Sequence, residues 1–180
     1  MLTGKLIELR ALTDDDEAVL YRVAADIDTW EERSPRSPAP LTLAAYRERE
    51  AKFVLAGDTR FVVAVDGQAI GTVALFNEDP LARHAEVGIA LLAASRGNGY
   101  GTEALRLIVG FAFTRRNLRR VYLSVLASNT GAMAAYRKVG FIAEGRLREH
   151  CWVRGRYEDE VAMGLLRSEW RALVGDLDRP

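Results

Sequence analysis

A glycine-rich segment lies between an apolar run and a helix-like run in the middle of the chain; its residues are Arg96, Gly97, Asn98, Gly99, Tyr100, Gly101 and Thr102. Glycines let the backbone approach a ligand closely and let successive N–H groups point into one concavity. The N-terminus of the following helix adds partial positive charge, and Arg96 can add a charge-assisted hydrogen bond. This pattern predicts a phosphate or diphosphate site, although a glycine turn that merely begins a helix has the same composition.

Two common nucleotide-binding motifs differ from this segment. No lysine follows Gly101, so the Gly-Lys-Ser/Thr ending of a phosphate-binding loop is absent. The glycines are spaced G-x-G-x-G, and Thr102 takes the last place of the G-x-G-x-x-G dinucleotide motif. Arg119 and Arg120 follow about 20 residues later, where a contact to a 2′-phosphate is expected in NADP-binding proteins. An NADP-linked oxidoreductase is therefore an alternative interpretation.

A second group of polar residues follows the next predicted strand. Ser128 or Asn129 can cap the helix that begins there. Tyr136 shares a face of this helix with Ala132 and Val139, at a spacing typical of core positions. Two adjacent strand-to-helix units would leave a cleft between their strand ends. Such a cleft suits a long, thin ligand whose phosphates lie on the first helix.

The elements that must position these residues are predicted from hydrophobic periodicity. Seven strands are expected at 5–12, 60–65, 69–76, 85–93, 121–126, 141–153 and 157–166, and four helices at 13–28, 41–56, 102–116 and 129–139. Asp66-Gly67 and Arg154-Gly155 predict tight hairpin turns. Strands and helices do not alternate regularly, so the order indicates an α+β fold.

Composition narrows the function classes. The chain has 180 residues, a length that suits a single domain over 1–180. Lys+Arg and Asp+Glu are both 25, so the basic excess typical of nucleic-acid binding is missing. No apolar run approaches the roughly 20 residues of a membrane helix, and charged residues interrupt the N-terminus. We therefore expect a cytoplasmic protein with no nucleic-acid or membrane partner.

Cysteine and histidine are scarce. The lone Cys151 rules out an internal disulfide framework, and with only His84 and His150 no metal site is expected. Cys151 is a poor candidate for an acyl-enzyme nucleophile. Its neighbour His150 would point to the opposite face of a strand and could not act as its base.

The two motifs together resemble those of the GNAT acetyltransferase superfamily. The pyrophosphate motif is matched by Arg96, Gly99 and Gly101. The later motif is matched by Asn129, Ala132, Tyr136, Lys138, Gly140 and Phe141. The resemblance covers 61–170 and is closest to ribosomal-protein N-terminal acetyltransferases and spermidine N-acetyltransferases, through Asp66-Gly67, 83–86 and 141–157.

The resemblance implies a fold and a co-substrate. The fold would be a mixed sheet of about seven strands, splayed between the fourth and fifth and flanked by about four helices. Acetyl-CoA would be the co-substrate, without a metal. Its pantetheine arm would pair with the backbone of Leu91, Leu92 and Ala93, and its pyrophosphate would lie on the segment from Arg96 to Thr102. Asn129 would contact the arm, and Lys138 would be a further cofactor-binding residue.

The resemblance also implies direct transfer of the acetyl group to a primary amine. The amine must lose a proton because an alkyl ammonium has a pKa of about 10. Glu86 is the candidate base, although an ordinary strand carboxylate is the alternative. A backbone N–H near Leu91 would stabilise the oxyanion. Tyr136 would assist the departing thiolate.

The acceptor is the least defined part. Trp30, Glu31 and Glu32 crowd a proline-rich loop and are candidates for holding a cationic amine, with Trp30 as a cation–π face. A protein N-terminus, a polyamine, an antibiotic or another small amine all fit. A homodimer is possible. A non-catalytic CoA-binding sensor on the same scaffold is the other alternative.

Overall fold

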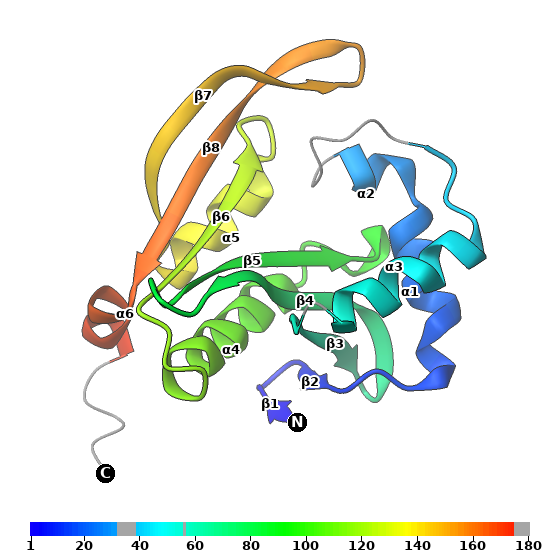
Figure 1. The fold of residues 1–180 in the computed structure, drawn as a ribbon, viewed down its shortest axis with the longest axis horizontal. Helices are drawn as coiled ribbons and strands as arrows, with labels where there is room; N and C mark the ends of the chain where they lie inside the picture. Colours follow the sequence, from blue (N-terminus) through cyan, green and yellow to red (C-terminus); the bar gives the residue numbers. More distant parts are fainter. Residues whose placement is uncertain (32–38, 56, 175–180) are drawn as a thin grey trace.

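The computed structural model describes residues 1–31, 39–55 and 57–174. Within them, eight strands form one sheet in the order β1-β2-β3-β4-β5-β6-β8-β7 (Figure 1). The strands are β1 Leu2–Thr3, β2 Glu8–Arg10, β3 Thr59–Val65, β4 Gln68–Asp79, β5 His84–Leu91, β6 Arg120–Leu126, β7 Ile142–Val153 and β8 Arg156–Leu166. All neighbours are antiparallel except β5 and β6, which run parallel.

The helices cover both faces of this sheet. They are α1 Glu17–Ala25, α2 Ile27–Glu31, α3 Leu43–Leu55, α4 Tyr100–Thr114, α5 Thr130–Val139 and α6 Arg167–Val174. The apolar stripe of α4, including Leu105, Ile108 and Phe113, packs with β3–β6 and α5 in the main core. Leu20 of α1 and Tyr46 of α3 form a smaller core with Val62.

The α+β fold with a mixed sheet is confirmed, but the element counts differ from those expected. The described residues form eight strands and not seven, because β1 lies at Leu2–Thr3, before the expected 5–12 strand, of which only Glu8–Arg10 is strand β2. A turn closed by the Gly4 N–H and the Ile7 carbonyl (2.9 Å) separates β1 from β2. The described part of the chain forms six helices, where four were expected. The 13–28 helix ends early because Asp26 is extended, with ψ of 114°, and a new helix begins at Ile27. The C-terminal α6 was not expected.

Both expected hairpin turns are confirmed. Asp66 and Gly67 have φ of +48° and +78°, and Arg154 and Gly155 have +49° and +79°. Positive φ at both central residues is the geometry of the tight turn whose twist matches paired strands.

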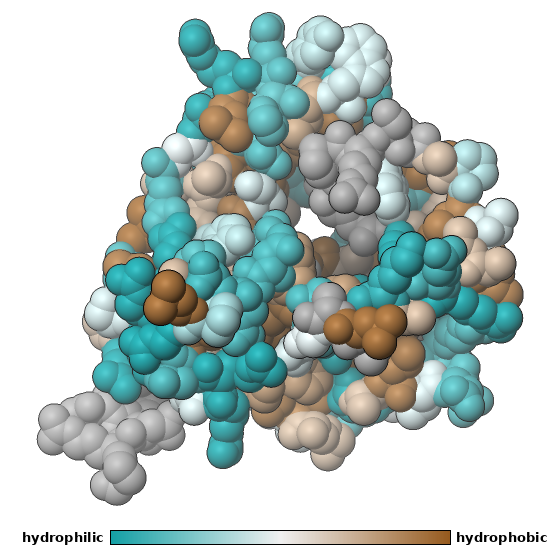
Figure 2. Space-filling view, viewed as in Figure 1, coloured by the Kyte–Doolittle hydropathy of each residue, from teal (hydrophilic) through white to brown (hydrophobic). Residues whose placement is uncertain are grey.

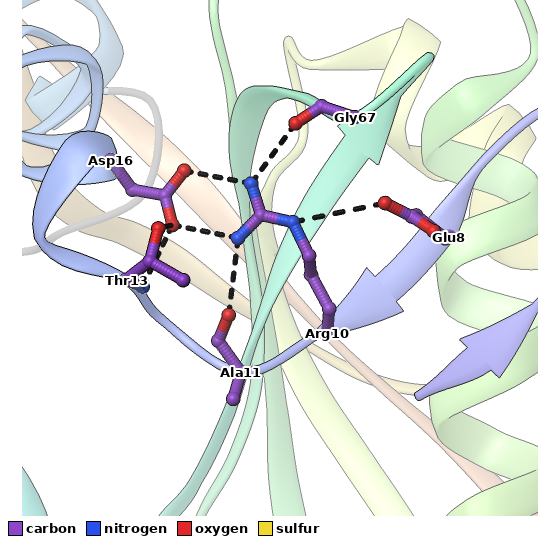
Figure 3. Close-up of polar contacts among 6 residues, drawn as sticks. All are labelled: Glu8, Arg10, Ala11, Thr13, Asp16 and Gly67. Carbon is purple, nitrogen blue, oxygen red and sulfur yellow. Dashed lines mark hydrogen bonds and ion pairs between the residues drawn. The ribbon is translucent and has the colours of Figure 1, made fainter.

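The Arg10 guanidinium connects the N-terminal segment to its neighbours through hydrogen bonds (Figure 3). Arg10 donates to both carboxylate oxygens of Asp16, at 2.7 and 2.8 Å, and to the Gly67 carbonyl at 3.2 Å. The Thr13 N–H donates to the same carboxylate at 2.9 Å. The Arg10 hydrogen bonds hold the pKa of Asp16 well below its usual range, so this carboxylate stays charged at ordinary pH. β2, the entry to α1 and the β3–β4 turn are thereby joined.

Candidate active site

Strands β5 and β6 pair only where they begin. His84–Glu86 align with Arg120–Tyr122, after which the strands separate while each continues. A cleft of about 420 Å³ opens between them, and a hollow is visible near the middle of the face in Figure 2, beside β5. The expected splay is therefore present. Many predicted site residues line this cleft: Glu86, Leu91, Arg96, Gly97, Gly99, Gly101, Thr102, Asn129, Tyr136 and Lys138.

One edge of β5 turns toward the cleft. The Leu92 N–H donates to the Ile70 carbonyl on β4 at 2.9 Å. Because alternate residues of an antiparallel pair face the partner, Leu91, Ile89 and Val87 direct their N–H and C=O groups to the opposite edge. This edge has lost β6 as a neighbour beyond Glu86. Of the expected residues 91–93, only Leu91 presents its backbone here, since Leu92 bonds to β4 and Ala93 begins a short 3-10 turn.

The glycine turn follows β5 and leads into α4. Gly97 and Gly99 have φ of +80° and +85°, a conformation that other residues rarely adopt. A side chain at Gly97 would meet nothing within 4 Å, so backbone conformation rather than space favours glycine there. Gly99 is the N-cap of the 15-residue α4. Its first N–H groups therefore open into the cleft side of the turn, where the helix dipole favours an anion.

Arg96 connects this turn to its surroundings. Its Nε donates to the Leu91 carbonyl at 3.3 Å, and its Nη2 donates to the Thr29 hydroxyl of α2 at 2.8 Å. A guanidinium carries five N–H donors, so one side chain can serve protein acceptors and a ligand together. Arg96 is thus a cation at the cleft whose position is fixed by two elements.

The second strand-to-helix unit supplies the other wall. Asn129 is the N-cap of α5, and its side-chain oxygen accepts from the Ala132 N–H at 3.1 Å. The capping interpretation is therefore correct, and the same side chain also lines the cleft. Lys138 is exposed and lines the cleft from the last turn of α5.

Tyr136 belongs both to the core and to the cleft. Its ring packs against Phe141 with centroids 5.9 Å apart, and only 8% of the residue is exposed. Burial raises the pKa of Tyr136 to about 12. The phenol is therefore protonated at neutral pH and can donate a hydrogen bond into the cleft.

Glu86 lies at the last paired residue of β5, where the strands separate. It is half-buried and lines the cleft, and the Asn77 amide donates to its carboxylate at 2.9 Å. Burial raises the pKa of Glu86, the Asn77 hydrogen bond opposes this, and the nearby Glu160 carboxylate adds to the increase. A carboxylate with a raised pKa in a cleft is a candidate acid–base group.

Several predicted residues lie beside the cleft and not in its lining. The Asn98 side chain donates to the Arg96 carbonyl at 3.1 Å, and Tyr100 packs against the main core. On α2, Trp30 lies 5.7 Å from the Arg49 guanidinium, and Glu31 pairs with Arg154 of the β7–β8 turn at 3.6 Å. Glu32 lies outside the described residues.

Other lining residues were not expected from the sequence. Thr29, Phe76 and Ser124 face the cleft, and Asn77 reaches Glu86 from a left-handed position with φ of +51°. Strand register would have suggested part of this set, because Phe76 is the direct partner of Glu86 on β4. Nothing in the local sequence identifies Thr29 as a lining residue, apart from its position next to Trp30.

The structure gives little support to the two alternative chemistries, NADP binding and a cysteine nucleophile. Arg120 aligns with His84 at the start of β5 and pairs with Glu144, whereas the glycine turn follows the end of that strand, roughly 20 Å away at about 3.3 Å per residue. Cys151 is buried, and burial raises the pKa of its thiol.

Across the described ranges, no group of three or more His, Cys, Asp or Glu side chains is placed to hold a metal ion. None of the described helices is long and apolar enough to cross a membrane.

Comparison with known proteins identifies the family. The family model for the acetyltransferase (GNAT) domain matches residues 7–142. The chain is 34% identical over 115 residues to the spermidine N(1)-acetyltransferase of Escherichia coli (strain K12), a match that covers 64% of this chain and 62% of that protein. It is 33% identical over 178 residues to the probable N-acetyltransferase YjcK of Bacillus subtilis (strain 168), covering 94% and 98% of the two chains.

A solved structure agrees with this assignment. The spermidine N-acetyltransferase from Vibrio cholerae in complex with CoA and spermine superposes with a TM-score of 0.85 at 27% identity, covering 93% of this chain and 99% of that one. The resemblance to spermidine N-acetyltransferases is therefore confirmed, although the matched stretch is less than two thirds of the Escherichia coli enzyme. The chain belongs to the GNAT acetyltransferase family.

Proposed function

We propose that this protein transfers an acetyl group from acetyl-CoA directly to a primary amine. One observation carries the proposal: a single cleft joins the glycine turn, the unpaired edge of β5, Tyr136 and Glu86. Glu86 lies about 17 Å from Leu91, the last residue of β5 before the turn, at about 3.3 Å per residue. This layout suits a long substrate whose phosphates lie at the turn and whose thioester lies toward Glu86.

The chain's own groups would hold acetyl-CoA along this path. N–H groups of the glycine turn and the start of α4 would bind the diphosphate, with Arg96 adding charge. The β5 edge at Val87, Ile89 and Leu91 would pair with the amide groups of the pantetheine arm. Asn129 and Lys138 would approach from α5.

Glu86 would accept the proton that the acceptor ammonium must lose. The released lone pair then attacks the thioester carbon, and the carbon–sulfur bond breaks as the amide bond forms. The nitrogen loses its second proton to the departing thiolate, so the products are the amide and the CoA thiol. The raised pKa of Glu86 brings its basicity closer to that of the amine than an ordinary carboxylate would have. Glu160, which is close enough to influence this pKa, adds a second negative charge that attracts a cation.

Hydrogen-bond donors on both walls of the cleft would stabilise the negative charges that develop on the oxyanion and on the departing sulfur. A backbone N–H on the β5 edge can bond to the oxyanion, and the Tyr136 hydroxyl can bond to the departing sulfur. A thiol has a pKa of about 8.5. The Tyr136 pKa of about 12 therefore favours donation of a hydrogen bond over full loss of its proton.

The acceptor class that we favour is a small cationic amine such as a polyamine. Support comes from the Glu86 carboxylate in the cleft, from the nearby Glu160 carboxylate, and from the spermine complex of the Vibrio cholerae relative. Trp30 and Glu31 stand beside the cleft on α2, next to Thr29, where an incoming amine would pass. A protein N-terminus is a second acceptor, and assembly as a homodimer stays a prediction.

Gly99→Asp should weaken CoA binding. Both Gly99→Asp and Gly99→Ala force a side chain onto a φ of +85°, but only aspartate adds negative charge beside the diphosphate site. Titration calorimetry should show a Kd for CoA about tenfold or more higher for aspartate than for alanine, in keeping with a local charge effect of about 1.4 kcal/mol. Equal Kd values for the two variants would contradict this placement of the diphosphate.

Tyr136→Phe should lower kcat by about tenfold or more while CoA affinity changes little. The substitution removes one hydroxyl and keeps the ring that packs on Phe141. Tyr46→Phe is a matched control, because Tyr46 is also buried but belongs to the α1–α3 core. Turnover of spermidine, followed by thiol release, tests this. Unchanged kcat in Tyr136→Phe would refute the assigned role and favour a CoA-binding sensor.

Glu86→Gln should change the pH profile of kcat/KM. In the wild type, the rate should rise as pH passes the raised pKa of Glu86 and then stay level, because the ionised carboxylate takes the ammonium proton. Because the variant lacks this base, it can use only the neutral form of the amine. Its log kcat/KM should therefore rise with a slope of about 1 per pH unit toward pH 10. At pH 7 we expect a loss of about 100-fold that shrinks as pH rises.

Glu78→Gln is the control for that profile, since Glu78 pairs with Arg116 outside the cleft lining. A Glu86→Gln profile parallel to that of the wild type would show that Glu86 is not the base.

A further inference from the structure

Thr29 is a buried polar residue between the two halves of the site. It is 5% exposed and lines the cleft from α2. Its hydroxyl accepts from Arg96 Nη2 at 2.8 Å, and its N–H donates to the Asp26 carboxylate at 2.6 Å. The Arg96 contact spans 67 positions of sequence, so it joins α2 to the distant start of the glycine turn.

The same guanidinium reaches the cofactor side. Arg96 Nε donates to the carbonyl of Leu91, the last residue of β5, and its backbone begins the glycine turn. A chain of hydrogen bonds thus runs from the β5 edge through Arg96 and Thr29 to Asp26, which starts α2.

α2 depends on such contacts for its order. It has only five residues, far fewer than an independently stable helix needs. Other side chains of α2 contact different elements: Trp30 contacts Arg49 of α3, and Glu31 and Asp28 contact Arg154 of the β7–β8 turn. Among these contacts, the one at Thr29 leads to the glycine turn.

We propose that the Arg96–Thr29 hydrogen bond couples cofactor binding to the acceptor side of the site. A diphosphate on the glycine turn fixes the Arg96 guanidinium, and Arg96 in turn fixes α2, the wall that an amine passes. This rests on the proposed function. Coupling is reciprocal, so an acceptor held against α2 strengthens CoA binding by the same factor. Thr29 is in this account a positioning residue.

Hydrogen–deuterium exchange of the α2 amides, with and without saturating CoA, tests the coupling directly. In the wild type, CoA should slow exchange across Ile27–Glu31 by about fivefold or more, the lower end of typical coupling factors. Thr29→Val removes the hydroxyl at similar size and should abolish the slowing, whereas Thr29→Ser should keep it. Thr42→Val is a control, because the Thr42 hydroxyl caps α3 through Ala45 and has no contact with Arg96 among those described.

A CoA titration of each protein separates the two possible failures. If the wild type does not bind CoA, the proposed function fails and this inference falls with it. If CoA binds but leaves α2 exchange unchanged, or protects Thr29→Val as well as the wild type, the coupling alone is refuted. Should Thr29→Val fail to fold, Thr29→Ala removes the same hydroxyl with the same expected result.

Discussion

The site depends on the short parallel contact between β5 and β6. Three residue pairs join the two halves of the sheet, and beyond them β5 keeps one neighbour where a central strand normally has two. Backbone N–H and C=O groups seldom stay unpaired away from water. The edge at 87–91 therefore favours a ligand that has amide groups of its own, and the two strand ends place a helix start on each side of that ligand.

Different parts of the resulting cleft favour ligands of opposite charge. Beside the glycine turn, the first turn of α4 and the Arg96 guanidinium favour an anion. Farther along β5, Glu86 and the nearby Glu160 favour a cation, and burial keeps the Tyr136 phenol of the cleft lining protonated. An anionic acyl donor and a cationic acceptor would thus enter with opposite orientations. In the proposed reaction, this arrangement would keep the two substrates apart until their reacting atoms meet.

The parts of the site that sequence could predict are those encoded locally. Gly97 and Gly99 adopt positive φ, Asn129 caps its helix, and both hairpin turns use residues that tolerate the left-handed region. The spacing of Tyr136 on α5 indicated its inward face correctly, because helical periodicity determines it.

The parts that sequence could not predict depend on contacts between distant segments. The Arg96–Thr29 and Asn77–Glu86 hydrogen bonds require the sheet register and the placement of α2 to be known first. The break between α1 and α2 was missed because 13–28 keeps an apolar stripe across Asp26, whose carboxylate caps the second helix. The same limit applies to the acceptor side, where the roles of Trp30 and Glu31 stay predictions.

A crystal structure of this protein with bound CoA tests the central claim most directly. We expect the diphosphate on the N–H groups of the turn at Gly97, Gly99 and Gly101, the pantetheine arm along the β5 edge, and the sulfur within hydrogen-bonding reach, about 3–4 Å, of the Tyr136 hydroxyl. A diphosphate bound away from this turn, or a sulfur on the far side of the sheet from Tyr136, would contradict it.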